Sequence, residues 1–337
     1  MHAPARFRRS MLMAGTAIVS AVSLAACGNI TNGAGAGDGS DFPTGPVTLN
    51  VGQAAGGSTD LIARAVASGV SEDLGVAVPV VNKPGANGAL ATQEVIGQPA
   101  DGHNLILLNA SLITVTPLAV GENEAVDLED LDIIAGLSRD DYVLITHADT
   151  EYETVEDIVS ADGEITYGTA GVGTASQLAQ AALFAQADVQ GRDIPFDSGA
   201  PAMAAVLGKQ VELATVQLGE AMPQIKAGTL RPIVVFSEER NEFLPDTPTA
   251  VEAGYDVPVS QYRAIAAPAG TPEPAKERLR EALEATFATE EYQQFNEQNM
   301  LTPEEISGEQ VKEDWTEYAE RYRTMAETYD IDLGGGN

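Results

Sequence analysis

The sequence predicts an α/β fold, and two observations support this prediction. From Val47 onward, short apolar runs alternate with longer amphipathic stretches, which is typical of strands and helices built around a parallel sheet. Two of the predicted strands also lead into helices through glycine-rich loops, at residues 52–57 and 168–173. Either loop alone is equally well explained as a plain strand-to-helix connection. Together they indicate an anion site, because glycine lets backbone N–H groups approach a bound group and a helix N-terminus favours negative charge.

Length and composition narrow the class of protein. The chain has 337 residues, enough for two ordinary domains with a sizeable core. It carries 50 Asp and Glu against 18 Lys and Arg. So large an acidic excess argues against nucleic-acid binding and against attraction to anionic lipid headgroups.

Residues 1–26 are expected to be a targeting segment. A basic region and a short apolar run at residues 11–21 precede the sequence Leu24-Ala25-Ala26-Cys27. This ending resembles the lipobox of bacterial lipoproteins, whose cysteine is lipid-modified and becomes N-terminal after cleavage. Cys27 is the only cysteine in the chain. We therefore expect a lipoprotein signal peptide with lipidation at Cys27; the alternative is a plain secretory signal with an incidental cysteine.

Residues 27–46 are expected to be the lipidated cysteine and a flexible tether. The stretch is rich in Gly, Ala, Ser, Asn and Asp and has no apolar periodicity. Cleavage before Cys27 would remove three arginines and no acids, which leaves 15 Lys and Arg against 50 Asp and Glu, a net charge of −35. An anion must therefore be held by local interactions rather than by long-range attraction.

The first elements follow a βαβαβ order. A strand at residues 47–51 is followed by a helix that begins at Ser58 and ends at Leu74-Gly75. Residues 76–81 predict a second strand, a helix then ends near Gly97, and residues 104–108 predict a buried strand. This order favours a parallel sheet.

The next elements repeat the same arrangement. Strands are predicted at residues 133–137, 142–146 and 165–167, with a short helix at residues 154–159 between the last two. The second glycine loop then leads into a helix that is capped by Thr174 and runs to Ala187. Further strands are predicted at residues 211–216 and 233–237, and further helices at residues 200–207, 221–227 and 274–329.

Motifs for catalysis are missing from the sequence. The order Gly-x-x-Gly-x-Gly at residues 168–173 is not the dinucleotide fingerprint, and neither glycine loop is followed by a P-loop lysine. No His or Cys cluster has metal-ligand spacing, and no Gly-x-Ser-x-Gly elbow occurs. Acid pairs such as Asp140-Asp141 carry little information in so acidic a chain. We therefore expect no catalytic residues, no metal and no cofactor.

Eight segments together resemble one known family. In order and spacing they are similar to the substrate-binding receptors of tripartite tricarboxylate transporters, also called the Bug family, and the similarity spans residues 47 to about 329. The segments are residues 53–60, 82–88, 101–102, 167–174, 208–212, 225–231, 244–249 and 267–272.

The resemblance implies a type II periplasmic-binding-protein fold, with two α/β lobes and a ligand cleft between them. One lobe would comprise residues 47–144 plus 262–337, and the other residues 145–261. In this family the two glycine loops hold the carboxylate of an organic acid, largely through backbone N–H groups, hydroxyl groups and water. Carried over to this chain, the ligand-binding positions are Gln53, Ala54, Gly57, Ser58, Thr59, Asp60, Thr169, Gly171, Thr174, Ser198 and Gly199.

Three positions depart from the family pattern or call for comment. Gln53 stands where the family usually has an aromatic residue, which suggests a more polar or an altered ligand. Arg263 is a further candidate ligand-binding residue, because a guanidinium can grip a second carboxylate bidentately; the alternative is an exposed arginine paired with one of the many acids. Asp60 is acidic beside an anion site, so we expect it to bond to backbone or to the opposing loop rather than to the ligand.

The implied function is that of an extracytoplasmic, lipid-anchored receptor. It would bind a small organic acid as a monomer, close its lobes, and deliver the acid to two integral membrane transporter subunits; no nucleic-acid partner is expected. One alternative is a ligand-sensing receptor for a signalling partner. A less favoured one is an enzyme on the same fold, because fold alone does not settle function.

Overall fold

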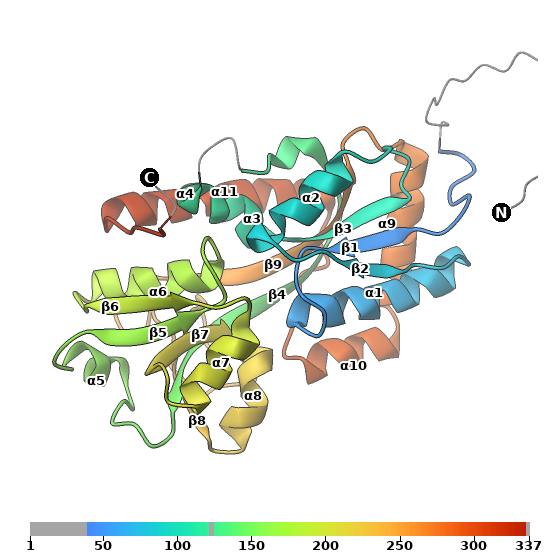
Figure 1. Ribbon diagram of the computed structural model, residues 1–337. Helices are drawn as coiled ribbons and strands as arrows, with labels where there is room; N and C mark the ends of the chain where they lie inside the picture. The colour runs from blue at the N-terminus through green and yellow to red at the C-terminus, as the bar shows by residue number, and fades with distance from the viewer. Residues whose placement is uncertain (1–38, 121–124, 335–337) are drawn as a thin grey trace, which may run out of the picture. The chain divides into compact units, whose positions relative to one another are not determined.

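A computed structural model describes residues 39–120 and 125–334 (Figure 1). The predicted signal peptide, Cys27 and most of the predicted tether lie outside the described residues. In the described part of the chain, no helix has the length and the apolar character needed to cross a membrane.

The first of two joined sheets contains the strand that opens the fold. Its order is β2 (Val80–Asn82), β1 (Thr48–Val51), β3 (Asn104–Asn109), β9 (Ser260–Pro268) and β4 (Leu131–His147), and β10 (Thr302–Pro303) also pairs with β4. Strands β1, β2 and β3 are parallel to one another, whereas β9 is antiparallel to both β3 and β4.

The second sheet shares β4 with the first. The later part of β4 pairs with β7 (Leu213–Gln217) and with β8 (Leu230–Val235), both antiparallel. Strand β5 (Ile165–Thr169) is parallel to β7 and to β6 (Gly191–Pro195). Strand β4 passes from one sheet to the other between Asp141 and Tyr142, so a single continuous backbone joins the two sheets.

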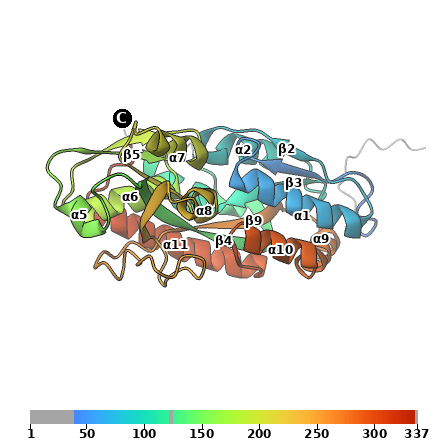
Figure 2. The same cartoon turned by 90° about the horizontal axis from the view of Figure 1, so that it is seen from below.

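Helices cover both faces of each sheet (Figures 1 and 2). On the first sheet, α1 (Ser58–Leu74), α9 (Glu273–Phe287) and α10 (Glu290–Gln298) cover one face, and α2 (Ala89–Ile96), α3 (Ala110–Thr114) and α11 (Gly308–Thr328) the other. On the second sheet, α5 (Val155–Val159) and α6 (Ala175–Gln186) lie opposite α7 (Gly199–Leu207) and α8 (Leu218–Lys226). The remaining short elements are α4 (Thr116–Ala119), η1 (Ala86–Gly88) and η3 (Leu128–Asp130).

The core follows directly from the periodicity of the sequence. Along β3, Leu105 and Leu107 face the α1 and α9 side, while Ile106 and Leu108 face the α2 and α3 side. This is the period of two that a strand buried on both faces requires. In α1 the buried residues Ile62, Val66 and Val70 recur every four positions, as expected for the apolar side of a helix.

Helix α11 packs on both sheets. Its residue Trp315 lies in the core of the first sheet, whereas Tyr322 and Met325 lie in the core of the second, together with Leu333 beyond the helix. The C-terminal segment therefore contacts the residues on either side of the point where β4 changes sheets.

The predicted division of the fourth strand is wrong. Residues 133–137 and 142–146 are one strand, β4, rather than two. The polar residues that separate them in the sequence are accommodated inside the strand: Asp141 is buried and accepts hydrogen bonds from Asn241 Nδ2 at 2.9 Å and from Ser260 Oγ at 2.7 Å. The parallel pairing predicted for the first βαβαβ elements is confirmed for β1, β2 and β3. The complete sheet is mixed, because β9 returns between β3 and β4 in the opposite direction.

Candidate functional site

The first glycine loop follows β1 and ends at the N-terminus of α1. Asp60, in the first turn of α1, accepts a hydrogen bond from the Gly56 N–H at 2.8 Å, from Arg64 Nε at 3.0 Å and from Asn82 Nδ2 at 3.0 Å. Burial alone would raise the pKa of Asp60, but the hydrogen bonds from Arg64, Gly56 and Asn82 lower it overall. The Asp60 side chain thus fixes the loop by binding the backbone N–H of Gly56, and the predicted bond of Asp60 to backbone is confirmed.

Other residues of the first loop are positioned by hydrogen bonds and close polar contacts with neighbouring residues. Gln53 Nε2 lies 3.5 Å from the carbonyl oxygen of Asn87, at the limit for a hydrogen bond. Thr59 is buried, and its hydroxyl oxygen lies 3.5 Å from Asn109 Oδ1. Ala54 accepts a hydrogen bond from the Gly57 N–H at 3.4 Å, which closes the turn before the helix.

The second glycine loop follows β5 and ends at the N-terminus of α6. Thr174 caps the helix: its hydroxyl donates to the carbonyl oxygen of Gly171 at 2.7 Å and accepts from the Gln177 N–H. Thr169 is fully buried and donates to Asp193 Oδ1 at 3.0 Å. The first backbone N–H groups of α6 have no carbonyl partner within the helix, as in any helix, and the Thr174 hydroxyl accepts from the N–H group of Gln177.

A third turn lies beside the second loop. Ser198 precedes α7, which begins at Gly199. A Cβ placed on Gly171 would lie 3.2 Å from the carbonyl oxygen of Phe196, so the second loop and this turn are in close contact. The N-termini of α6 and α7 therefore open toward the same region of the second sheet.

Contacts between the sheets bring these turns to the first loop. Asn87 Nδ2 donates to the carbonyl oxygen of Gly173 at 3.2 Å, and Thr116 Oγ1 donates to the same oxygen at 3.0 Å. Glu220, in the first turn of α8, lies near the backbone N–H of Ser58 at the start of α1, which opposes the rise that burial causes in the pKa of Glu220. Figure 1 shows α1 beginning next to α7 and α8.

Arg263 lies beneath the first loop rather than at the surface. It projects from β9 and is 1% exposed, so the alternative of an exposed arginine is wrong. Its two terminal nitrogens each lie 3.4 Å from Asp140 Oδ2, and Nη2 also lies 3.3 Å from Ser58 Oγ. Arg263 is thus paired with an acid and touches the first residue of α1.

Asp140 is the buried partner of this arginine. Ser58 Oγ donates to Asp140 Oδ2 at 3.3 Å. Burial raises the pKa of Asp140 to about 7; Arg263 opposes the rise, while Glu220 and Asp141 add to it. Two acids therefore face one guanidinium at the junction of the two sheets.

Three contributors to this region were missed by the sequence analysis. Asn87 lies in the segment 82–88 that carries the family resemblance but was given no role there, Glu220 carries no sequence signal of its own, and Asp140 was set aside because acid pairs are common in this chain. A further hint was the position of Asn87 and Glu220 next to glycines, in Asn87-Gly88 and in Gly219-Glu220.

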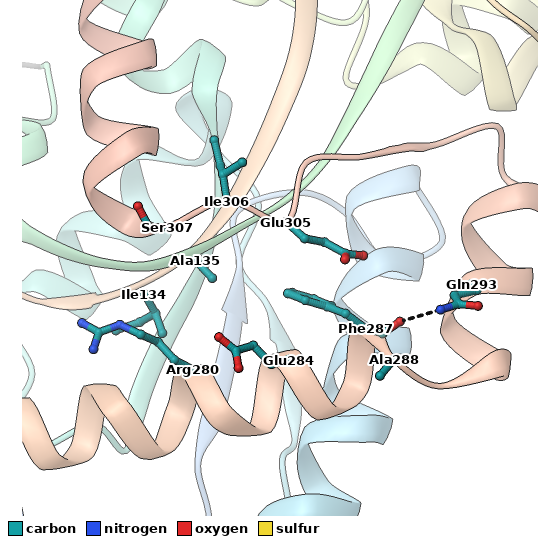
Figure 3. A pocket seen from close by; sticks show the side chains of 10 residues that line it. All are labelled: Ile134, Ala135, Arg280, Glu284, Phe287, Ala288, Gln293, Glu305, Ile306 and Ser307. Carbon is teal, nitrogen blue, oxygen red and sulfur yellow. Dashed lines mark hydrogen bonds between the residues drawn. The ribbon is translucent and has the colours of Figure 1, made fainter.

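Two surface cavities of the described chain lie away from the glycine loops. One, of about 390 Å³, is bordered by α9 and α10 on one side and by residues 305–307 on the other (Figure 3). The other, of about 840 Å³, lies between α11 and residues 125–128. Within the described residues no group of three or more His, Cys, Asp or Glu side chains is arranged to hold a metal ion.

The architecture defines the class of protein. Two α/β lobes that share a long strand, with glycine loops and helix N-termini at their junction, form a two-lobed solute-binding protein of the periplasmic type. The solved structure of the periplasmic binding protein BugD is similar, with a TM-score of 0.79 and 28% identity over 86% of this chain and 99% of BugD. MatC from Rhodopseudomonas palustris, solved with bound malate, is also similar, with a TM-score of 0.76 and 25% identity over 84% of this chain and 99% of MatC.

Sequence comparison gives the family. A family model described as the tripartite tricarboxylate transporter family receptor matches residues 62–330. A UPF0065 protein from the TAR-I ttuE-ttuC' intergenic region of Agrobacterium vitis is 33% identical over 252 residues, which are 73% of this chain and 72% of that protein. The chain belongs to the tripartite tricarboxylate transporter receptor family.

Proposed function

We propose that this protein is an extracytoplasmic receptor that binds a small organic carboxylate, such as a di- or tricarboxylate, and delivers it to a tripartite tricarboxylate-type transporter with two membrane subunits. The observation that carries the proposal is the meeting of the helix N-termini of α1, α6 and α7 where the two sheets join. Membership of the family supports the proposal that the partner is a tripartite tricarboxylate-type transporter. The malate bound to the related MatC supports the proposal that the ligand is a small carboxylate.

In this proposal the backbone supplies most of the binding. The N–H groups at the start of α1 and α6 would hold the ligand's carboxylate, while Thr169, Thr174 and Asp60 fix the shape of the two loops. A helix N-terminus stabilises an anion by roughly 0.3–2 kcal/mol, and a hydrogen bond to a charged acceptor by about 1.5–3 kcal/mol. Several such contacts suffice for micromolar affinity, which requires about 8 kcal/mol.

The test is direct measurement of ligand binding. Native mass spectrometry of the protein as purified should reveal a bound small acid, and calorimetry with mono-, di- and tricarboxylates should identify which of them bind. We expect the bound acid to be recovered chemically unchanged. Its conversion to a product would favour an enzyme, and the absence of binding by every acid tested would refute the proposal.

Delivery to a transporter needs a separate experiment. Cells that produce the two membrane subunits should take up the identified acid only when this receptor is also present. Uptake that does not depend on the receptor, together with a transcriptional response that does, would favour a signalling partner instead.

Lipid anchoring is the part of the proposal that rests on sequence alone. Replacement Cys27→Ser should release the protein from the membrane fraction without changing its ligand affinity. Membrane association that survives this replacement would refute an anchor at Cys27.

A further inference from the structure

Glu220 reaches from one sheet to the other at the junction. It belongs to α8 on the second sheet, yet the backbone N–H of Ser58, at the start of α1 on the first sheet, is near enough to oppose the rise that burial causes in the pKa of its carboxyl group. On its other side it lies against the start of α7, where a Cβ on Gly199 would be only 2.0 Å from Glu220 Oε2. A side chain at position 199 would displace this carboxylate. Glu220 thus contacts two residues, Ser58 and Gly199, that sequence similarity places among the ligand-binding positions.

The charges around Glu220 leave an excess of negative charge. Arg263 is the cation that acts on Glu220, and it is already paired with Asp140 at 3.4 Å. Asp141, the next acid along β4, is bonded to Asn241 and Ser260. Two carboxyl groups, Asp140 and Glu220, thus share one guanidinium. Such a site favours a further donor and disfavours a further ionised carboxylate.

Two unpaired acceptor atoms also favour a ligand that carries a hydrogen-bond donor. Among the described residues, Glu220 Oε2 and Asp140 Oδ1 are buried and have no hydrogen-bond donor. Asp140 is 1% exposed, whereas Glu220 as a residue is only partly buried, although its Oε2 atom is covered. Glu220 is therefore the acid of the two whose carboxylate an incoming molecule can approach, with a small rotation of the side chain. A buried acceptor without a donor is costly, and a ligand group that donates to it recovers that cost.

We propose that Glu220 selects the ligand by binding a hydrogen-bond donor, an ammonium or a hydroxyl group, carried on the carbon chain of the carboxylic acid. The inference rests on the proposed function, since it takes the ligand's carboxylate to lie at the N-termini of α1 and α6. A donor-bearing acid presents its carboxylate to the loops and its ammonium or hydroxyl group to Glu220. An unsubstituted diacid leaves Glu220 Oε2 unpaired.

The experiment compares three acids of equal length by calorimetry: succinate, malate and aspartate. Malate adds a hydroxyl group to succinate and aspartate adds an ammonium group, so the pair also separates the two kinds of donor. The parent protein should bind malate or aspartate at least tenfold more tightly than succinate. In Glu220→Gln this preference should fall at least fivefold, through weaker binding of the donor-bearing acid, tighter binding of succinate, or both.

Two further variants serve as controls. Glu239→Gln removes the same charge from an exposed position near the second sheet and should leave all three affinities unchanged. Glu220→Asp keeps the charge and should retain more of the preference than Glu220→Gln does. Circular dichroism and the unfolding temperature check that each variant is folded.

The outcomes separate this inference from the proposed function. Equal binding of the three acids by the parent, or an unchanged preference in Glu220→Gln, would overturn the role of Glu220 while the carboxylate receptor stands. Failure of all three acids and of longer di- and tricarboxylates to bind would overturn both.

Discussion

Asn87 and Thr116 both connect the second glycine loop to residues of the first sheet, and Asn87 makes the larger number of side-chain contacts. Its backbone adopts the left-handed conformation with φ at 50°, and its Nδ2 donates to Ser111 Oγ, Thr116 Oγ1 and the Gly173 carbonyl oxygen at 3.0–3.2 Å. Asparagine tolerates this conformation better than most residues do. The Asn87 side chain therefore helps to hold the second glycine loop, and with it the second lobe, close to the first lobe.

Replacement of Asn87 should loosen that link. We expect Asn87→Gly, which keeps the left-handed backbone without strain, to weaken carboxylate affinity several-fold, because part of the binding energy must then close the lobes. Asn87→Asp should weaken it more, since the carboxylate would face the Gly173 carbonyl oxygen. Calorimetry measures the affinities, and solution scattering should show a larger radius for both ligand-free variants. Parent-like values in both measurements would refute a linking role.

Asp140 should make stability depend on pH. Its pKa rises on folding from an ordinary value of 3.8 to about 7, so between about pH 4 and pH 7 the folded protein binds more protons than the unfolded chain. The free energy of unfolding should therefore fall as the pH rises through this range. Glu220, whose pKa is also raised by burial, acts in the same direction.

Asp140→Asn tests this assignment. The variant should show a smaller loss of stability between pH 4 and pH 7, measured by urea unfolding at several pH values, even if it is less stable overall because Arg263 loses its partner. An unchanged slope of stability against pH would show that other groups titrate in this range.

At the scale of elements, the first glycine loop contains one close backbone contact, between Gly52 and Gly88. A Cβ on Gly52, directly after β1, would lie 2.3 Å from the Gly88 Cα. The Gly57 position has room, with the carbonyl oxygen of Ala54 3.6 Å away, and its φ of −80° suits any residue. Gly52 therefore sets how closely β1 approaches the start of α2.

A matched pair of substitutions tests this contact. Gly52→Ala should lower the free energy of unfolding by about 2 kcal/mol or more, because backbone must move to admit the methyl group. Gly57→Ala should change it by less than about 1 kcal/mol. Thermal and urea unfolding of both variants measure the difference, and equal effects would contradict the proposed close approach.

The sequence predicted elements wherever apolar periodicity was regular. The helices at α1 and α6 and the strands β1, β3 and β5 were placed from their patterns, and the two glycine loops from their composition. The single strand β4 was missed because Arg139, Asp140 and Asp141 interrupt its apolar run. Only the fold reveals that the partners of these acids are Asn241, Ser260 and Arg263, which are more than 90 positions away. Glu220 was missed for the same reason, since its partners come from other sheets and helices.

At the scale of the whole molecule, net charge opposes the proposed ligand. The chain carries a formal charge of −32, so long-range attraction cannot recruit an anion, and binding must rest on contacts at the loops. Added salt screens repulsion as well as attraction.

The expected salt dependence follows. Raising the ionic strength from about 0.05 to 0.5 M should leave carboxylate affinity unchanged or strengthen it, as measured by calorimetry with a potassium salt that does not itself bind. A tenfold loss of affinity over this range would indicate that an exposed cationic side chain, rather than the helix N-termini, holds the ligand.

The position of β9 has a consequence for how the chain acquires its structure. This strand lies between β3 and β4, so the first sheet cannot be completed until residues 260–268 are available, more than 200 positions after β1. Contacts that close such long loops form slowly, because the entropy of closure must be lost before the pairing stabilises the sheet. A growing chain would therefore lack the complete first sheet through most of its synthesis. In the extracytoplasmic role proposed above, that delay would help the chain to cross a membrane before its first sheet is complete.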